Sequence, residues 1–385
     1  MSKRFNFGGI LGSKRVTGGF STGGYLGQKD PGIYSLRALA GLHKRWAAPA
    51  IDAFDFYLTS AGAATTTTLQ TGPTTAQITS QSVPAGTLGG SNGYQEWTVP
   101  AAGNYRFTLE GARGGVSIAT SASRAAISGW NHFSPASNPS QKRCARGAKV
   151  QGVVSLNAGD VITVLVGQQG ADDPGNGQNP SGGGGTFVSL GTKAQVEAGS
   201  DNLLFAAGGA GGYAGDGGSD NYTAGEGQST NTNSNGNSGA NGSVGNGAAQ
   251  ATSDGNSGGG GGYLTNSSNG STINFTDIEL TGRIAYGFRR GGHGAEHTSG
   301  SNDQGGFGGG GAGSSQTGLD DDKGGGGGYS GGAYAFDAFS FGGGGGSYAN
   351  PAATSTTLTR GGAQYNNGAT GVSEGNGSVY IEFGF

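Results

Sequence analysis

The chain lacks most of the features that stabilise small secreted proteins or anchor proteins in membranes. It contains one cysteine, Cys144, among its 385 residues, so no disulfide can form within the chain. No run of about 18 apolar residues occurs, and we therefore predict no membrane insertion. Residues 1–19 are basic but lack the continuous apolar stretch of a signal peptide. Charged residues make up only 12% of the chain and the net charge is −3, so the high charge typical of disordered chains is missing too.

Glycine, by contrast, is abundant: the chain has 88 glycines, and 60 of them follow Ser181. Without a strict Gly-X-Y period, this composition is typical of low-complexity or disordered segments. Aromatic residues beside the glycines argue against disorder, because a flexible linker has no reason to place a ring there. We predict that these rings seal an ordered layer of bare backbone; a contact surface for a partner is the alternative. The glycine runs are residues 182–185, 258–262, 308–311, 324–328 and 342–346, and the sealing rings are Phe187, Tyr263, Tyr329, Phe341 and Tyr348.

Alternating apolar and polar residues predict β-strands on both sides of the glycine-rich part. The last of them, 378–383, would pin the intervening residues as closed loops if it paired with the earlier strands. One helix is expected at 34–46, where Ser35 is a suitable N-cap and Pro49 follows. We therefore predict a mainly β fold in which β-sandwich-like strands frame the glycine runs. The expected strands are 94–99, 105–109, 149–156, 161–166, 186–190, 203–207 and 378–383.

Composition divides the chain into three parts. Residues 1–50 are expected to form a basic extended arm with the short helix, and residues 51–93 a Thr/Ala/Gly-rich linker or loosely packed strands. Residues 94–385 form the predicted β-framed glycine-rich domain. Disorder is expected in the Thr-rich residues 60–92 and in the Asn- and Ser-rich residues 229–257. The latter are also the expected exposed loop, where a rigid scaffold tolerates variation for binding.

The arm carries a charge opposite to that of the remaining chain. Residues 1–50 hold eight Lys or Arg residues against Asp30 alone, a charge of +7, so the rest must carry −10 to give the net charge of −3. A basic arm on an acidic body favours docking to an acidic surface, of a protein or of a nucleic acid. Interspersed aromatic residues and glycines favour an extended peptide in a groove of a protein partner. The residues expected to dock are Lys3, Arg4, Phe5, Phe7, Lys14, Arg15, Tyr25, Arg37 and Trp46.

The order and spacing of these segments resemble the glycine-rich extracellular region of the anaplastic lymphoma kinase and leukocyte tyrosine kinase receptors. The shared pattern is a strand ending in Trp-x-Val-Pro, an aromatic strand into Gly-Ala-x-Gly-Gly, and a valine-rich strand into Val-Gly-Gln-x-Gly. Polyglycine and Ala-Ala-Gly-Gly follow. The resemblance covers roughly residues 94–385, but the cysteines, transmembrane segment and kinase of those receptors are missing, so their receptor function is not implied. The matching segments are 97–100, 105–109, 111–115, 161–170, 182–188 and 203–209.

In that family the region contains bundled polyproline-II helices of glycine wrapped by β-strands, and the resemblance implies the same architecture here. Such a helix has three residues per turn and no internal hydrogen bonds, so its backbone must bond to neighbouring runs. Glycine-rich polyproline-II sandwiches also form the tip adhesins of T-even-like phage tail fibres, where loops between the runs contact host surface proteins. In the arm, residues 31–36 followed by Trp46 and Pro49 resemble a segment of marine-phage virion proteins.

Two motifs suggest metal chemistry. His293, Glu296 and His297 fit the H-x-x-E-H pattern of zinc hydrolases, which requires a helix to place both histidines on one face. Glycines surround this motif, so we expect a surface loop there instead. The three aspartates 320–322 could hold calcium or form a solvated acidic loop. We predict no catalytic residues, no cofactor and no metal site, with calcium at 320–322 left open.

These patterns and resemblances together imply a non-enzymatic structural protein of a phage virion. The arm would dock on another virion protein of the tail or head. The glycine-rich domain would project from the particle as part of a symmetric oligomer, with a trimer as the expected form. Its role would be adhesion to a host-surface receptor or reinforcement of the particle. The alternative is a glycine-rich binding module of a cell surface or extracellular matrix that does not belong to a virion.

Overall fold

The structure is a computed structural model, in which the chain separates into residues 1–52 and residues 53–385. All described residues belong to the second part, which we call the body. The predicted helix at 34–46 therefore lies outside the described residues, as does the rest of the arm. The described residues are 53–59, 72–115, 145–172, 179–212, 225–234, 242–249, 258–267, 284–296, 304–313, 323–335, 341–361 and 375–384.

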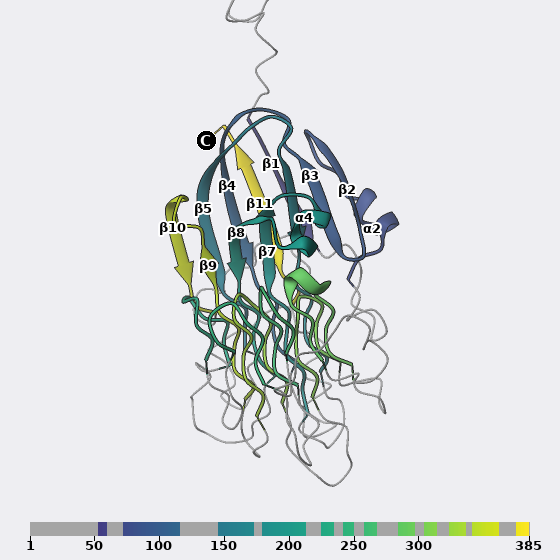
Figure 1. Cartoon of the computed structure of the whole chain (residues 1–385), viewed down its shortest axis with the longest axis vertical. Helices are drawn as coiled ribbons and strands as arrows, with labels where there is room; N and C mark the ends of the chain where they lie inside the picture. The colour runs from purple at the N-terminus through teal and green to yellow at the C-terminus, as the bar shows by residue number, and fades with distance from the viewer. Residues whose placement is uncertain are drawn as a thin grey trace, which may run out of the picture. The chain divides into compact units, whose positions relative to one another are not determined.

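The body is mainly β, with two antiparallel sheets among its described residues (Figure 1). Sheet A has the order β1 (Phe54–Thr59), β11 (Ser378–Phe383), β4 (Gly103–Glu110), β5 (Lys149–Leu156) and β10 (Thr354–Thr359). Sheet B has the order β2 (Thr87–Ser91), β3 (Tyr94–Thr98), β6 (Val161–Leu165), β7 (Thr186–Leu190), β8 (Asn202–Ala207) and β9 (Tyr348–Ala349). The described helices are α2 (Thr75–Thr79), α4 (Lys193–Ala198) and the 3₁₀ turn η4 (Phe288–Arg290).

Alternation of side chains explains the register of sheet A. In β4, Tyr105, Phe107 and Leu109 are fully buried, whereas the polar residues between them are only partly buried. β11 pairs with β4 along its whole length, and β1 pairs with the other side of β11. The strand predicted at 378–383 is therefore confirmed, and it joins the first strand of the body to β4.

One hydrophobic core is shared by the two sheets. Rings of sheet A meet rings of sheet B: the centroids of Phe56 and Trp97 lie 5.3 Å apart, and those of Phe107 and Phe205 lie 6.0 Å apart. Gly152 in β5 lies under Phe205, where an added Cβ would stand 2.5 Å from the ring, so glycine makes room for it. Each buried ring of this kind contributes about 1.5–3 kcal/mol relative to an exposed one.

The two α-helices are short and are fixed by their first turns. Thr74 caps α2 and Thr192 caps α4, and in each helix a glutamine three residues later accepts from the N–H of the capping residue. Gly199 ends α4 in the left-handed conformation, with a φ of 72° that favours glycine. These caps explain how the two described helices persist with only one or two turns.

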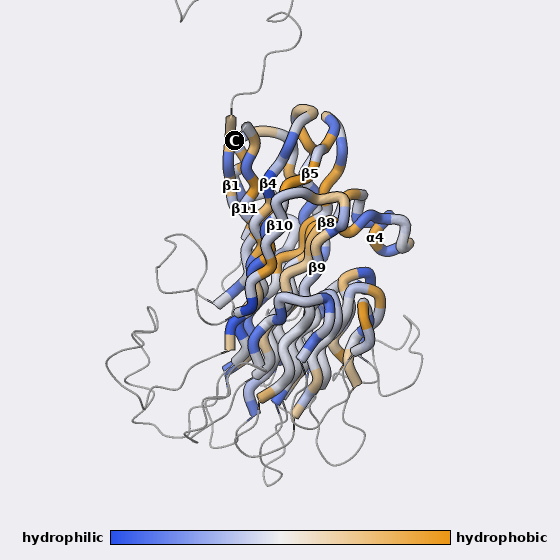
Figure 2. Tube along the Cα trace, turned by 90° about the vertical axis from the view of Figure 1, so that its left-hand side faces the viewer, coloured by the Kyte–Doolittle hydropathy of each residue, from blue (hydrophilic) through white to orange (hydrophobic). Residues whose placement is uncertain are grey.

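Glycine segments continue from the ends of the strands and pack against one another (Figure 1). In Figure 2 they are pale, whereas the strands alternate between blue and orange. The amide of Gly209 donates to the carbonyl of Gly327 at 2.7 Å, and the amide of Gly327 donates to Gly183 at 2.9 Å. A Cβ on Gly183 would stand 2.1 Å from the carbonyl oxygen of Arg113, so a side chain does not fit there. We call residues 111–115, 167–171, 181–185, 208–212, 258–262, 305–311, 324–328 and 342–346 the glycine layer.

The structure bears on two expectations about linkers and loops. Residues 51–93, expected as a linker or loosely packed strands, contribute the strands β1 and β2 and the helix α2 in their described part. The compact unit that holds the glycine runs begins at residue 53, whereas the predicted domain begins at 94. The inward series Phe54, Phe56 and Leu58 outweighs the loop-like composition that follows it, and Leu58 is fully buried.

The expected exposed loop at 229–257 is exposed only in part among its described residues: 230–232, 243 and 244 are exposed, whereas others bond to the glycine runs. Ser234 donates from its backbone amide to Gly344 at 3.1 Å, and the amide of Ala248 donates to Gly260 at 2.9 Å. Asn and Ser residues there lie against glycine runs, because small polar side chains tolerate close backbone approach and hydrogen-bond to it. Asn233, for example, donates from its side chain to Gly331.

Candidate functional site

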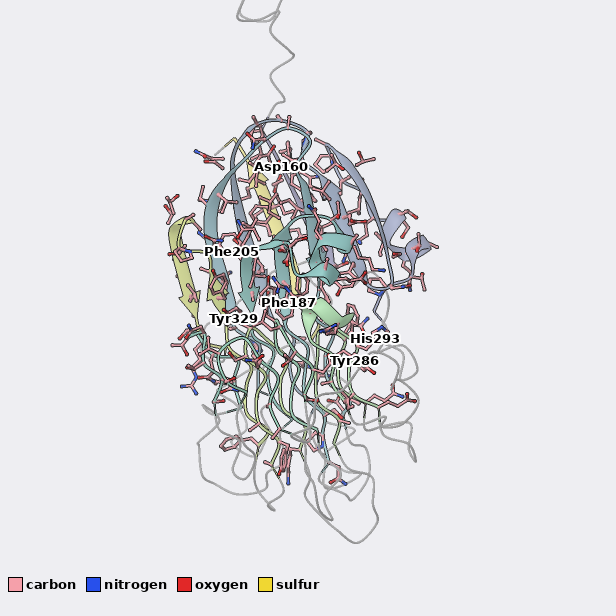
Figure 3. The ribbon with its side chains drawn as sticks, in the orientation of Figure 1. Asp160, Phe187, Phe205, Tyr286, His293 and Tyr329 are labelled. Atoms are coloured by element: carbon pink, nitrogen blue, oxygen red, sulfur yellow. The ribbon has the colours of Figure 1, made fainter. Side chains whose placement is uncertain are left out.

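Five stacked aromatic rings form a continuous row where the sheets meet the glycine layer; we call them the ring row. The centroid distances are 4.7 Å for Tyr348 and Tyr329, 5.9 Å for Tyr329 and Tyr263, 5.9 Å for Tyr263 and Phe288, and 4.8 Å for Phe288 and Phe187. The planes of successive rings differ by 16°, 19°, 22° and 20°. Figure 3 shows Phe187 and Tyr329 at this boundary.

The ring row forms because several glycine runs end at the same level. The amide of Tyr263 donates to the carbonyl of Tyr329 at 2.9 Å, and the amide of Tyr329 donates to Gly346 at 2.8 Å. These bonds hold neighbouring runs in register, so the residue that follows one run stands beside the residue that follows the next. Stacked pairs of this kind contribute about 0.5–1.5 kcal/mol each beyond their burial.

A buried carboxylate, Asp201, ties the ring row to sheet B. Its side chain is completely buried, and it accepts from Ser189 Oγ at 2.5 Å and from the Tyr263 hydroxyl at 3.1 Å. Arg289 forms an ion pair with it at 2.9 Å, while the guanidinium lies 4.4 Å from the centre of the Tyr263 ring. Burial, and then the charge of Asp201, raise the pKa of the Tyr263 hydroxyl, which therefore stays a neutral donor. The cluster is a satisfied ion pair that fixes the contact between sheet B and the ring row, which we call the junction.

Tyr94 and His293 complete the junction beside β3. The Tyr94 hydroxyl donates to the carbonyl of Phe288 and accepts from a backbone N–H at 3.1 Å. Burial raises the pKa of this hydroxyl. The imidazole of His293 lies edge-on to the rings of Tyr286 and Phe307, with centroids 5.9 Å and 6.3 Å away, and burial lowers its pKa. His293 is therefore uncharged at neutral pH.

At the end away from the sheets, residues of different runs meet at one level, which we call the far layer. The amide of Gly115 donates to the carbonyl of Ser181 at 2.7 Å, and the amide of Gly212 donates to Gly324 at 2.8 Å. The amide of Gly342 donates to Gly212 at 2.9 Å. These five residues define the far layer, and they come from five separate stretches of the glycine layer.

Several segments outside the described residues come within one residue of a run of the glycine layer in sequence; we call six of them the connecting segments: 116–144, 173–178, 213–224, 297–303, 314–322 and 336–340. Residues that flank these segments are joined to one another. The amide of Gly114 donates to Ala145 at 3.1 Å, and that of Ala171 donates to Gln304 at 3.0 Å. At the other end of the body tight turns connect β3 to β4 and β5 to β6, and α4 connects β7 to β8. Figure 3 shows Asp160 of the turn before β6 remote from the glycine segments. The described residues that flank the connecting segments therefore share one end of the body.

The predicted sealing rings occupy both levels. Phe187, Tyr263, Tyr329 and Tyr348 stand together in the ring row. Phe341 instead precedes its glycine run and lies near Gly225 at the far layer, where a Cβ on that glycine would be 3.3 Å from the Phe341 Cβ. The predicted docking residues of the arm lie outside the described residues.

The H-x-x-E-H motif has no helix. Residues 291–296 follow η4 in a non-helical course, and the carbonyl of His293 accepts from the amide of Tyr286 at 2.8 Å. Glu296 is exposed, and His297 lies outside the described residues. In the part of the chain that the structure describes, which does not include 320–322, no group of three or more His, Cys, Asp or Glu residues could hold a metal ion.

Several residues of the junction were missed by the sequence analysis. Phe288 completes the ring row although no glycine run precedes it directly. Arg289 and Asp201 stand 88 positions apart, so no local pattern pairs them. The only signal was the adjacent Arg289 and Arg290 in a stretch poor in charge, which indicates a specific partner for at least one of them.

Neither a scan against models of known protein families nor a search of curated proteins finds a match to this chain. None of the helices in the described ranges has the length and apolar character needed to span a membrane. The geometry of the body and the patterns of the sequence are therefore the basis for inferring a function.

Proposed function

We propose that this chain is a non-enzymatic structural protein of a phage virion, anchored by residues 1–50, that presents its connecting segments for adhesion to a host-surface receptor or for reinforcement of the particle. The observation that carries the proposal is the far layer. Described residues at that end flank the six connecting segments of variable length, whereas tight turns and the short helix α4 make the connections at the opposite end. A rigid framework with long connections gathered at one end is typical of binding proteins.

The sequences of the connecting segments suit contact with a partner. They are rich in Ser, Asn, Asp and Gly, and they contain rings: Trp130, Phe133, Tyr222, Phe336 and Phe339. Aromatic residues dominate the energetics of protein interfaces, and small polar residues supply adaptable hydrogen bonds. This composition supports a role of the connecting segments in adhesion rather than as mere links between the glycine runs.

The glycine layer supplies the rigidity that such presentation needs. We infer that its runs are polyproline-II helices packed side by side, that the two sheets form a sandwich above them, and that the ring row seals the boundary. Bonds between runs, such as that of Gly183 to Ala210 at 2.7 Å, support this inference, because a polyproline-II helix has no internal hydrogen bonds. The resemblance to phage tip adhesins and to the receptor glycine-rich region supports it as well.

The arm is the proposed anchor on an acidic tail or head protein. It joins the body at residue 53, next to β1. Phe54 pairs with Phe383 at the end of sheet A that carries the tight turns, whereas Thr59 pairs with Ser378 at the end next to the glycine layer. The attachment point and the far layer thus lie at opposite ends of the body. We propose a homo-oligomer, with a trimer favoured; light scattering of the purified chain would test this.

Adhesion is tested by measuring binding of the labelled full-length chain to a panel of bacterial cells. We expect Trp130→Ala with Phe133→Ala to weaken binding by about tenfold or more, because buried interface rings are hot spots. The control is Tyr57→Ala, which removes a ring that is 45% exposed on sheet A, away from the far layer. If no cell binds the chain, or if both variants lose binding equally, adhesion through the connecting segments is refuted and reinforcement is left.

Anchoring is tested by deleting residues 1–50 and following incorporation into particles. We expect incorporation to be lost while the circular dichroism of the body is unchanged. Incorporation without the arm would refute the docking role. Binding to a cell surface by a chain that never enters particles would instead favour a cell-surface module.

A further inference from the structure

Strand β1 is the first element of the body that a pull on the arm would reach. It begins at Phe54, directly after the arm, and lies at one edge of sheet A among the described strands. All of its six residues pair with β11, from Phe54 with Phe383 to Thr59 with Ser378. Ser378 pairs in turn with Glu110, which precedes the glycine layer. β1 therefore runs from the attachment end of the body toward the far layer (Figure 1).

Side chains on both faces of β1 oppose sliding along β11. On the outer face the rings of Tyr57 and Tyr380 stack with centroids 4.5 Å apart, and the Tyr380 hydroxyl donates to Asp55. On the inner face Leu58 is fully buried, and the ring of Phe54 lies 5.3 Å from that of Phe383. Sliding by one residue would move every inward side chain of β1 to the solvent face.

The end of β1 next to the glycine layer is also fastened to sheet B. The amide of Thr59 donates to Gln81 Oε1 at 3.0 Å, and its carbonyl accepts from Gln95 Nε2 at 2.7 Å. Gln81 and Gln95 are themselves hydrogen-bonded at 2.7 Å. These side chains occupy backbone groups of an edge strand that would otherwise face an open edge.

We propose that β1 has a mechanical function: it transmits tension between the arm and the far layer by shear against β11. The inference rests on the proposed function, since it takes the arm as the anchor and the far layer as the end that makes contact. Tension between these two ends acts along β1. It therefore loads all six residue pairs at once, together with the Tyr57–Tyr380 stack and the contacts of Thr59.

Tension between the two ends of the chain would act quite differently. Phe54 and Phe383 are paired neighbours, so pulling them apart opens the β1–β11 pairing one residue pair at a time. Sequential opening breaks the interactions of one residue pair at a time, whereas shear must break the interactions of all pairs together. The same protein should therefore be strong in one direction of pulling and weak in the other.

The chain's one cysteine allows this comparison without mutation. Cys144 directly precedes Ala145, which accepts from Gly114 beside the far layer at 3.1 Å. Full-length protein held by an N-terminal tag is pulled either through a maleimide handle on Cys144 or through a C-terminal tag, at one loading rate. We expect the rupture force through Cys144 to be at least about twofold the force through the C-terminus, because the cross-strand pairs share the load. Equal forces, or a weaker Cys144 geometry, would overturn the proposal.

Two matched variants locate the loaded element. Tyr57→Ala in β1 should lower the rupture force through Cys144, whereas Thr357→Ala, an exposed position of β10 at the other edge of sheet A, should not. If Tyr57→Ala has no effect, or Thr357→Ala lowers the force as much, β1 is not the strand that transmits the tension. These forces are measured on isolated protein. Equal rupture forces would contradict the role of β1 but not the results on cell binding and particle incorporation. A negative result in those two assays would contradict the proposed function but would not change the measured forces.

Discussion

Replacing Gly183 by alanine tests whether the glycine layer is a packed structure. An added Cβ would stand 2.1 Å from the carbonyl oxygen of Arg113 and 2.8 Å from that of Ala112, closer than the 3.0 Å that real Cβ atoms respect. The run must shift by about 1 Å, since packed interiors have no slack to absorb the methyl group. Its bonds to Ala210 at 2.7 Å and from Gly327 at 2.9 Å would then be stretched or lost. Overpacking and two weakened hydrogen bonds together should lower the free energy of unfolding by about 3–5 kcal/mol.

The matched control is Gly89→Ala in β2, where an added Cβ meets nothing within 4 Å. Alanine is easier to order than glycine in regular structure, so this change should be neutral or stabilising by about 0.5–1 kcal/mol. Urea unfolding followed by tryptophan fluorescence, to which the buried Trp97 contributes, gives both values. A loss below about 1 kcal/mol at Gly183, or an equal loss at Gly89, would refute the close packing of the runs.

Three further predictions concern the junction. Tyr329→Ala interrupts the ring row and should cost about 2–4 kcal/mol with loss of near-ultraviolet circular dichroism; an unchanged spectrum would contradict the stacking. Asp201→Asn leaves Arg289 without its buried carboxylate and should cost about 2–4 kcal/mol in urea unfolding, against less than about 0.5 kcal/mol for the exposed Glu197→Gln; equal losses would contradict the role of burial. The folded-state pKa of His293 is lowered, so its contribution to stability is complete above about pH 6.5 and is lost as the pH falls through the folded pKa. His293→Gln should flatten the fall in melting temperature below pH 6.5, and an unchanged slope would show that another group is responsible.

The strands that the sequence predicted are those with clear local patterns: alternating apolar and polar residues in β4 and β5, and a nearly continuous apolar run in β6. Residues 149–156 and 186–190 are strands with the predicted bounds, and β4, β6 and β8 differ by only one or two residues at their ends. β10 was missed because Thr354–Thr359 has few apolar residues, as suits an edge strand that is largely exposed. β1 was missed because its short apolar alternation stands between proline-containing and threonine-rich stretches that favour loops.

The ring row could be predicted only in part. A ring directly after a glycine run, or after one further residue, is visible in the sequence, and four such rings are brought together. Which ring stands beside which depends on how the runs are ordered in space, and no local pattern encodes that order. Phe288 and the Asp201–Arg289 pair were out of reach for the same reason, because their partners come from distant segments.

The position of β11 has a consequence for how the protein can be made. Sheet A needs residues 378–383 in its interior, between β1 and β4, and the contact of Asp55 with Tyr380 joins positions 325 apart. During synthesis β1 and β4 therefore leave the ribosome without the strand that separates them, and their edges stay available for wrong pairing until residues 378–383 have followed. Contacts so distant in sequence also make folding slow. A chain that stops before residue 378 cannot complete this sheet, so such products remain substrates for chaperones and proteases.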